Sequence, residues 1–152
     1  MAESKQTIRA GIVGSGFAAS FHLEAMRKVY GVKVDIVGVY SPTAENCRAF
    51  AEAHAIPVCA ELSSLIDQSD VVHLCTPPST HERVGVEVLD KDKYVIIEKP
   101  FTGYFGGGEQ DFSGDTFDRR EGFEKAMASV KNLLTAEERS QGKICYAENW
   151  IY

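Results

Sequence analysis

The chain has 152 residues and a formal net charge of −6. An acidic surface repels phosphate groups, so we expect neither nucleic acid nor an anionic membrane as a partner. The length suits one domain with a single core. No apolar run is long enough to cross a membrane, and the first residues contain no hydrophobic signal core, so we expect a cytoplasmic protein.

A strand, a glycine turn and a helix are predicted in succession near the N-terminus. The largely apolar segment from Ile8 to Val13 is typical of a strand buried on both faces. The pattern G-x-G-x-x-A follows from Gly14 to Ala19 and leads into a helix predicted to run to about Tyr30. In dinucleotide-binding folds the first glycine permits a sharp turn, the second lets the backbone approach a pyrophosphate, and the small third residue lets the helix lie close to the strand. Free N–H groups at the start of the helix would then bind the phosphates.

Strands and helices alternate along the chain as far as residue 100. Further strands are predicted at 34–40, near 58, at 71–76 and at 94–97, and further helices at 62–66 and 79–90. Another helix is predicted with Ser41 as its N-cap and Pro42 as its first residue. Apolar strands that alternate with helices indicate a doubly wound, mostly parallel sheet with helices on both faces, a Rossmann-like α/β fold. Ligands bind beyond the C-terminal strand ends of such sheets, where Gly14, Ser41, Thr76 and Lys99 lie.

The periodic pattern lapses from Thr102 to Phe117, a stretch with five glycines. A loop of this length is usually functional or disordered, and both a role at the ligand edge and a plain surface insertion remain open. Thr116 or Asp118 is expected to cap a helix over residues 119–140. A last strand is expected over residues 143–150.

The cysteines and histidines give no sign of a metal site. The four cysteines and four histidines show neither a C-x-x-C pair nor the spacing of metal ligands. Cys75 and Cys145 lie in apolar, strand-like runs, so we expect both to be reduced core residues. His22 lies within the first helix and is expected to pack or hydrogen-bond within the fold rather than touch a ligand.

Three motifs occur in order along the chain. They are G-S-G-F-A-A-S-F-H at Gly14 to His22, T-P-P-S-T-H at Thr76 to His81, and E-K-P at Glu98 to Pro100. Together they resemble the nucleotide-binding half of the Gfo/Idh/MocA oxidoreductases, well over residues 8–100 and loosely over 119–152. This resemblance implies an enzyme that transfers hydride between NAD or NADP and a sugar, cyclitol or related polyol. It also implies a homo-oligomeric full-length protein.

The resemblance implies roles for individual residues. Lys99 would be the catalytic residue, pointing at the nicotinamide and at the reacting oxygen of the substrate, where its ammonium could stabilise alkoxide charge. Glu98 would hold this lysine electrostatically, and Pro100 would fix the backbone. His81 would either contact the cofactor or serve only as a first-turn helix residue. The expected cofactor-binding residues are Gly14, Ser15, Gly16, Phe17, Ala18, Ala19, Ser41, Thr43, Thr76, Pro77, Pro78, His81, Glu98, Lys99 and Pro100.

The end of the second strand bears on the choice between NAD and NADP, because an acidic residue there binds the ribose diol. The sequence has Y-S-P-T at 40–43, and Asp35 lies at the other end of the strand. Without that carboxylate a 2′-phosphate is not repelled. Ser41 and Thr43 could hydrogen-bond it, with Arg48 as a remote candidate. NADP is therefore favoured over NAD, although hydroxyl groups accept NAD too.

The chain departs from the family pattern in three places. Asp92 stands where the family commonly has a glycine before the fifth strand, and aspartate tolerates a left-handed turn. The glycine-rich insertion follows Pro100, and the final A-E-N-W-I-Y lacks the arginine often found after the last strand.

The family places most substrate contacts in a second α/β domain after the last strand. We expect that domain to be absent from this chain. Residues 1–152 would then form an NAD(P)-binding domain that binds cofactor and turns over substrate poorly or not at all. Two alternative functions remain open: an NAD-dependent glycoside hydrolase that acts by transient oxidation, and a non-catalytic nucleotide sensor.

Overall fold

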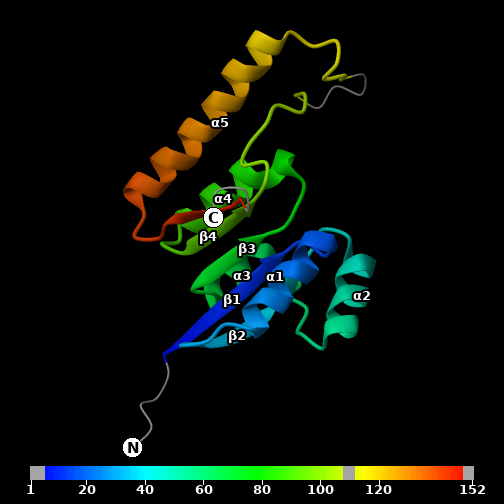
Figure 1. Cartoon of the computed structure of the whole chain (residues 1–152), viewed down its shortest axis with the longest axis vertical. Helices are drawn as coiled ribbons and strands as arrows, with labels where there is room; N and C mark the ends of the chain where they lie inside the picture. The colour runs from blue at the N-terminus through cyan, green and yellow to red at the C-terminus, as the bar shows by residue number, and fades with distance from the viewer. Residues whose placement is uncertain (1–5, 108–111, 149–152) are drawn as a thin grey trace, which may run out of the picture.

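The computed structural model describes residues 6–107 and 112–148 as one alternating α/β unit (Figure 1). The elements are β1 (Thr7–Val13), α1 (Phe17–Arg27), β2 (Lys33–Tyr40), α2 (Ala44–His54), α3 (Leu62–Gln68), β3 (Val71–Leu74), a 3₁₀ turn (Pro78–Thr80), α4 (His81–Leu89), β4 (Tyr94–Glu98), α5 (Arg119–Arg139) and β5 (Ile144–Ala147). The expected alternation of strands and helices is confirmed. None of the described helices is long and apolar enough to cross a membrane.

The five strands form one sheet in the order β2-β1-β3-β4-β5, and every neighbouring pair is parallel. In the strand register Val13 lies opposite both Tyr40 and Leu74, and Leu74 lies opposite Ile97. The C-terminal ends of β1 to β4 therefore meet at one edge of the sheet. The chain moves outward from β1 to β2 and then returns to the other side of β1. This reversal creates the switch point at which open α/β sheets bind ligands.

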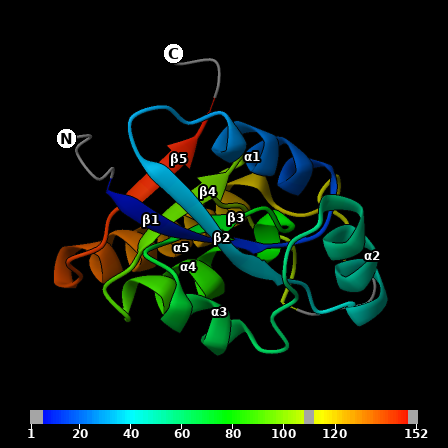
Figure 2. The same ribbon diagram turned by 90° about the horizontal axis from the view of Figure 1, so that it is seen from below.

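Helices cover both faces of the sheet, as the apolar strands predict (Figure 2). One core cluster joins α1 and α2 to β1, β2 and β3, and the other joins α3, α4 and α5 to β1, β3 and β4. Successive residues of β1 point to opposite faces, so Ile12 belongs to the first core and Val13 to the second. The doubly wound, Rossmann-like fold is thus confirmed.

The α1 side of the sheet is only partly covered. Its core cluster contains no residue of β4 or β5 in the part of the chain that the structure describes. Cys145 of β5 is accordingly exposed, so the expectation that it is a core residue is wrong, whereas Cys75, directly after β3, is buried as expected. Burial raises the pKa of the Cys75 thiol to about 12, which keeps this thiol protonated and unreactive.

Several element boundaries differ from those expected. Helix α2 begins at Ala44 with Thr43 as its N-cap, so the prediction that Ser41 caps the helix and Pro42 begins it is wrong. The Ser41 hydroxyl instead accepts a hydrogen bond from Ser15 Oγ at 3.1 Å, across the tips of β1 and β2. The strand expected near residue 58 is reduced to a single bridge with Val39, because it has no continuous neighbour in the sheet.

The later boundaries follow the expectations more closely. The Asp118 carboxylate caps α5 by accepting the backbone N–H of Glu121 at 2.8 Å. Asp92 adopts the left-handed conformation expected of it, with φ of 57°. Strand β5 ends at Ala147, and the last residues of the strand expected over 143–150 lie outside the described residues.

The described parts of the glycine-rich segment form an aromatic cluster rather than a helix or strand. The ring centroids of Tyr104, Phe112 and Phe117 lie 5.0–5.4 Å apart, and Lys125 Nζ lies 5.0 Å above the Tyr104 ring. In Figure 1 the segment leaves the tip of β4 and runs beside the first half of α5, which extends beyond the sheet. The insertion therefore starts at the ligand edge and supports a projecting helix.

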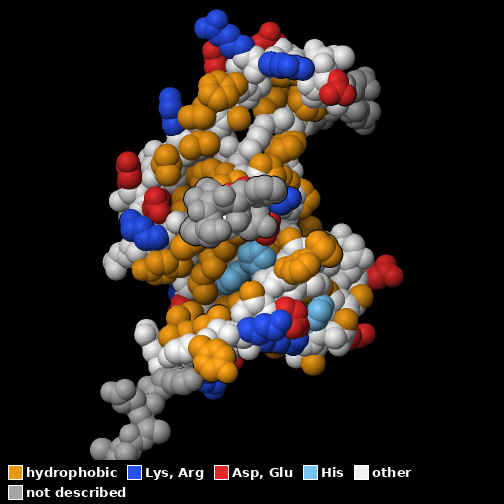
Figure 3. Space-filling model, in the orientation of Figure 1, with side chains coloured by type: hydrophobic (Ala, Val, Ile, Leu, Met, Phe, Trp, Pro, Cys, Tyr) orange, Lys and Arg blue, Asp and Glu red, His pale blue; other side chains and the backbone are white. Residues whose placement is uncertain are grey.

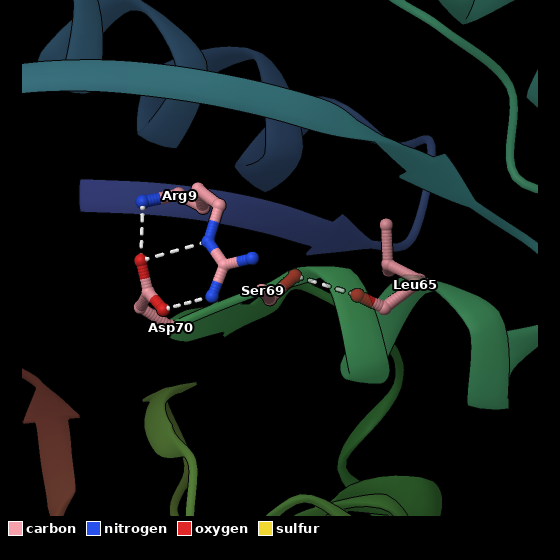
Figure 4. A network of polar contacts seen from close by, with 4 residues as sticks. All are labelled: Arg9, Leu65, Ser69 and Asp70. Carbon is pink, nitrogen blue, oxygen red and sulfur yellow. Dashed lines mark hydrogen bonds and ion pairs between the residues drawn. The ribbon is translucent and has the colours of Figure 1, made fainter. Parts of the chain in front are cut away.

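At the opposite edge of the sheet, an ion pair between Arg9 and Asp70 links β1 to the start of β3 (Figure 4). The Asp70 carboxylate accepts the backbone N–H of Arg9 at 2.8 Å and its guanidinium N–H groups at 3.2 and 2.6 Å. Beside it, Ser69 Oγ donates to the carbonyl oxygen of Leu65 at 2.7 Å. The hydrogen bonds from Arg9 lower the pKa of Asp70 to about 2. These contacts hold the start of β3 against β1.

We expect Asp70→Asn to lower the free energy of unfolding by about 1 kcal/mol at pH 7, a small value because the pair is partly exposed and screened. The pKa of Asp70 is lower in the folded state, so its contribution is present above the unfolded value of 3.8 and is lost as the pH falls towards 2. Urea denaturation of both proteins at several pH values measures this difference. Asp67→Asn, which removes the exposed pair with Lys91, is the control. A difference that persists at pH 2 contradicts the assignment to Asp70.

Candidate functional site

The turn between β1 and α1 has the two properties that a phosphate-binding turn needs. Gly14 has φ of 111°, and a Cβ there would lie 2.4 Å from the carbonyl oxygen of Cys75, so only glycine fits between the tips of β1 and β3. A Cβ at Gly16 would meet no atom within 4 Å. Gly16 is also the N-cap of α1 and supplies no side-chain cap. The first turn of α1 therefore begins without a side-chain acceptor and with open space beside Gly16, an arrangement that fits a pyrophosphate.

Ala19 lies fully buried beneath this turn, in the core cluster that joins α1 to the sheet. Its small side chain lets the helix lie close to β1. At the next tip, Ser15 and Ser41 are joined through their hydroxyl groups. Asp35 lies opposite Arg9 in the strand register, near the start of β2 and far from this edge. The tip of β2 therefore offers hydroxyl groups rather than a carboxylate.

A buried histidine joins the tips of β3 and β4. The His81 side chain is completely buried, with Nε2 2.9 Å from the carbonyl oxygen of Thr76 and Nδ1 3.2 Å from those of Pro100 and Phe101. This imidazole has no exposed surface for a ligand. Any part that His81 takes in cofactor binding therefore acts through the two loops that it joins.

The loop after β3 is further braced by its own side chains. Thr76 Oγ1 lies 2.6 Å from Thr80 Oγ1, and Thr80 Oγ1 donates to the carbonyl oxygen of Pro77 at 2.9 Å. Pro78 begins the 3₁₀ turn that leads into α4. Together with His81, these contacts give the loop a fixed position at the ligand edge.

The E-K-P segment ends β4 at the same edge, and its Lys99–Pro100 peptide bond is cis. The Glu98 carboxylate accepts the backbone N–H of Lys99 through Oε2 at 3.1 Å, and its Oε1 lies 2.9 Å from His22 Nε2. Among the described residues no ion pair joins this carboxylate to the Lys99 ammonium. Glu98 thus contacts the main chain of the lysine, whereas the sequence predicted an electrostatic hold on its side chain.

A pocket of about 650 Å³ joins the glycine turn to the E-K-P segment. It is lined by Phe17 and Ala18 at the start of α1, by Glu98 and Lys99 at the end of β4, and by Ala147 of β5. Its volume lies within the usual range for small-molecule sites. Figure 3 shows histidine side chains, in pale blue, among hydrophobic side chains near the middle of this face. The two motifs that are furthest apart in the sequence therefore share one cavity.

Two histidines contribute to this pocket and were not predicted as site residues. His22 of α1 and His73 of β3 both line it, with their Nδ1 atoms 2.8 Å apart. Burial, aided by the neighbouring His22, lowers the pKa of His73 to about 3. The expectation that His22 hydrogen-bonds within the fold is confirmed. The one available signal for His73 is a polar residue in the otherwise apolar run V-V-H-L-C.

Comparisons with known proteins agree with this geometry. Residues 8–109 match a family model described as oxidoreductase family, NAD-binding Rossmann fold. Glucose-6-phosphate 3-dehydrogenase of Bacillus subtilis is 28% identical over 60% of this chain and 26% of its own length. Inositol 2-dehydrogenase of Salmonella typhimurium is 33% identical over 95% of this chain and 46% of its own length.

Solved structures share the same architecture. An oxidoreductase from Thermotoga maritima superposes with a TM-score of 0.73 at 26% identity, over 95% of this chain and 39% of that one. The chain thus spans between a quarter and a half of the length of the relatives it matches. Since the family match covers most of the chain, this protein belongs to the Gfo/Idh/MocA oxidoreductase family, whose members carry an NAD-binding Rossmann fold.

Proposed function

We propose that this chain is the nucleotide-binding domain of an NAD(P)-dependent oxidoreductase that transfers hydride to or from a sugar, cyclitol or related polyol. The observation that carries the proposal is the cavity shared by Phe17 and Ala18 of the glycine turn and by Glu98 and Lys99 of the E-K-P segment. The printed names of the relatives, glucose-6-phosphate 3-dehydrogenase and inositol 2-dehydrogenase, support the class of substrate.

In this proposal residues at the C-terminal edge of the sheet would hold the cofactor. The free N–H groups after Gly16 hold the pyrophosphate, and Ser41 and Thr43 face the adenosine ribose. The loop of Thr76, Pro77 and Pro78 would form one wall of the site, and the cavity beside Phe17 would hold the nicotinamide.

A bound cofactor would supply the hydride chemistry, and Lys99 would act at the oxygen of the substrate. In oxidation Nζ would take the hydroxyl proton, and the resulting ammonium would donate a hydrogen bond to the oxygen and stabilise its alkoxide charge until hydride leaves the carbon. In the reverse direction Nζ holds the proton that the oxygen receives. Glu98 fixes the main chain of Lys99 by accepting its N–H, so the ammonium is presented from a rigid strand end.

Cofactor titration tests the binding part of this proposal. We expect saturable, micromolar-range binding of NADH and NADPH, measured by cofactor fluorescence. NADPH should bind a few-fold more tightly, because the tip of β2 offers hydroxyl groups in place of a carboxylate. Folded protein that binds neither cofactor overturns the proposal, and tighter binding of NADH overturns only the preference for NADP.

Replacement of the lysine tests the chemical part. In a dehydrogenase assay of the whole oxidoreductase that contains this domain, with a panel of sugars and cyclitols, Lys99→Ala should lower kcat by about 10²–10⁴-fold while changing the Kd for the cofactor by less than about threefold. Lys93→Ala, just before the other end of the same strand, should leave both quantities unchanged. Turnover that survives the loss of Lys99 removes this residue from the mechanism.

A further inference from the structure

Three polar side chains from three different elements form a chain in the wall of the pocket. Glu98 of β4 lies 2.9 Å from Nε2 of His22 on α1, and Nδ1 of His22 lies 2.8 Å from Nδ1 of His73 on β3. The His22 and Glu98 side chains are only 12% and 20% exposed. They are therefore held in place while still bordering the cavity.

This arrangement can take up one proton without losing a contact. When His22 is neutral, its Nε2–H donates to Glu98 and its bare Nδ1 accepts a hydrogen bond from Nδ1–H of His73. When His22 carries a second proton, its own Nδ1–H donates to Nδ1 of His73, whose single proton has then moved to Nε2 of that ring. The contact with Glu98 then becomes an ion pair. Burial lowers the pKa of His73 to about 3, so the added proton resides on His22 and not on His73.

The other groups around His22 leave Glu98 as its closest charged partner. Besides His73 of β3, the next loop contributes the buried Cys75 thiol, whose high pKa keeps it neutral. The end of β4 contributes Lys99, and Glu148 follows β5 on the rim of the pocket. On α1 itself, Glu24 and Arg27 pair with each other, 3.0 Å apart. A proton on His22 therefore acts mainly by offsetting the charge of Glu98.

We propose that protonation of His22 sets the preference of this cavity between oxidised and reduced nicotinamide. The inference rests on the proposed function, because it requires the nicotinamide to lie beside Glu98 and Lys99. The oxidised ring carries a positive charge and the reduced ring does not. With His22 neutral, the Glu98 carboxylate favours the oxidised cofactor. With His22 protonated, the ion pair cancels that attraction, so the preference shifts towards the reduced cofactor.

Binding measurements between about pH 5 and pH 8, where histidines titrate, test this inference. The Kd of the reduced cofactor is taken from fluorescence, and the Kd of the oxidised cofactor from its displacement of the reduced one. We expect the ratio of the oxidised to the reduced Kd to rise about three- to tenfold as the pH falls, the size of a modest coupling between two sites. By the same linkage, calorimetry in two buffers of different ionisation enthalpy should detect more proton release with the oxidised cofactor than with the reduced one.

Substitutions separate this role from a purely structural one. His22→Gln can still donate to Glu98 but cannot take the proton, so its ratio should stay at the high-pH value at every pH. Glu98→Gln removes the charge that the proton offsets, so its ratio at high pH should already equal the low-pH ratio of the unchanged protein. His54→Gln, on α2 beside Ser20, is the matched control and should keep the profile of the unchanged protein.

The outcomes distinguish this inference from the proposed function. Cofactor binding with a ratio that does not change with pH overturns the role of His22 and leaves the proposed function standing. Loss of the pH profile in His54→Gln overturns the role of His22 in the same way. Folded protein that binds neither redox form overturns the proposed function itself. If His22→Gln does not fold, the pH series of the unchanged protein and of Glu98→Gln still decides the question.

Discussion

Gly16→Ser is expected to weaken cofactor binding by about ten- to hundredfold while leaving the fold as stable as before or slightly more stable. Serine is a preferred N-cap residue, and its hydroxyl can accept the N–H groups of the first turn of α1, which Gly16 leaves uncapped. The same hydroxyl fills the open space above Gly16 and occupies the donors that the pyrophosphate needs. Losing one hydrogen bond to a charged group corresponds to about 1.5–3 kcal/mol, which gives the expected loss of affinity.

Thermal melts and fluorescence titrations on the same samples measure both effects. Gly114→Ser is the matched control, because a Cβ at Gly114 also meets no atom within 4 Å but lies in the glycine-rich loop, away from the turn. This control should change neither quantity. If Gly16→Ser binds cofactor as well as the unchanged protein does, the pyrophosphate does not lie at the start of α1.

The glycine turn shows why part of this site could be predicted from the sequence. Gly14, Gly16 and Ala19 act within six residues of one another, so their spacing alone specifies a strand end, a turn and a helix start. The parallel sheet could be predicted for a similar reason, since each strand is an apolar run between turn residues. The expectation for Cys145 failed because nothing in the run I-C-Y-A indicates which face of β5 a helix will cover.

The polar chain behind the pocket could not be predicted in the same way. His22 is separated by 51 residues from His73 and by 76 from Glu98, and no spacing rule connects them. Their meeting depends on the strand order, which places β3 and β4 side by side, and on the packing of α1 over β3. The E-K-P motif did indicate Glu98, but as a partner for the Lys99 side chain. The contact of Glu98 with the His22 imidazole depends on where α1 packs on the sheet, which the motif does not specify.

His81→Leu is expected to lower the free energy of unfolding by about 2–3 kcal/mol, because one imidazole N–H donates either to the carbonyl group of Thr76 or to those of Pro100 and Phe101, and leucine offers no donor. At about 2–4 °C per kcal/mol for a chain of this size, the melting temperature should fall by about 4–12 °C. Leucine has a similar bulk but no polar atom, so the change removes the hydrogen bonds and leaves little cavity. His54→Leu, where the ring lies 3.5 Å from Ser20 Oγ on a less buried surface, is the control and should cost about 1 kcal/mol or less.

The same substitution decides how His81 contributes to cofactor binding. The sequence placed it among the cofactor contacts, whereas the fold buries its ring between two loops. If His81 acts by holding those loops, binding should weaken together with stability, and His81→Leu should bind better again under conditions that restore stability, such as added sulfate. If binding is lost while the melting temperature is unchanged, the imidazole contacts the cofactor directly, and the two strand tips do not depend on this histidine to form one site.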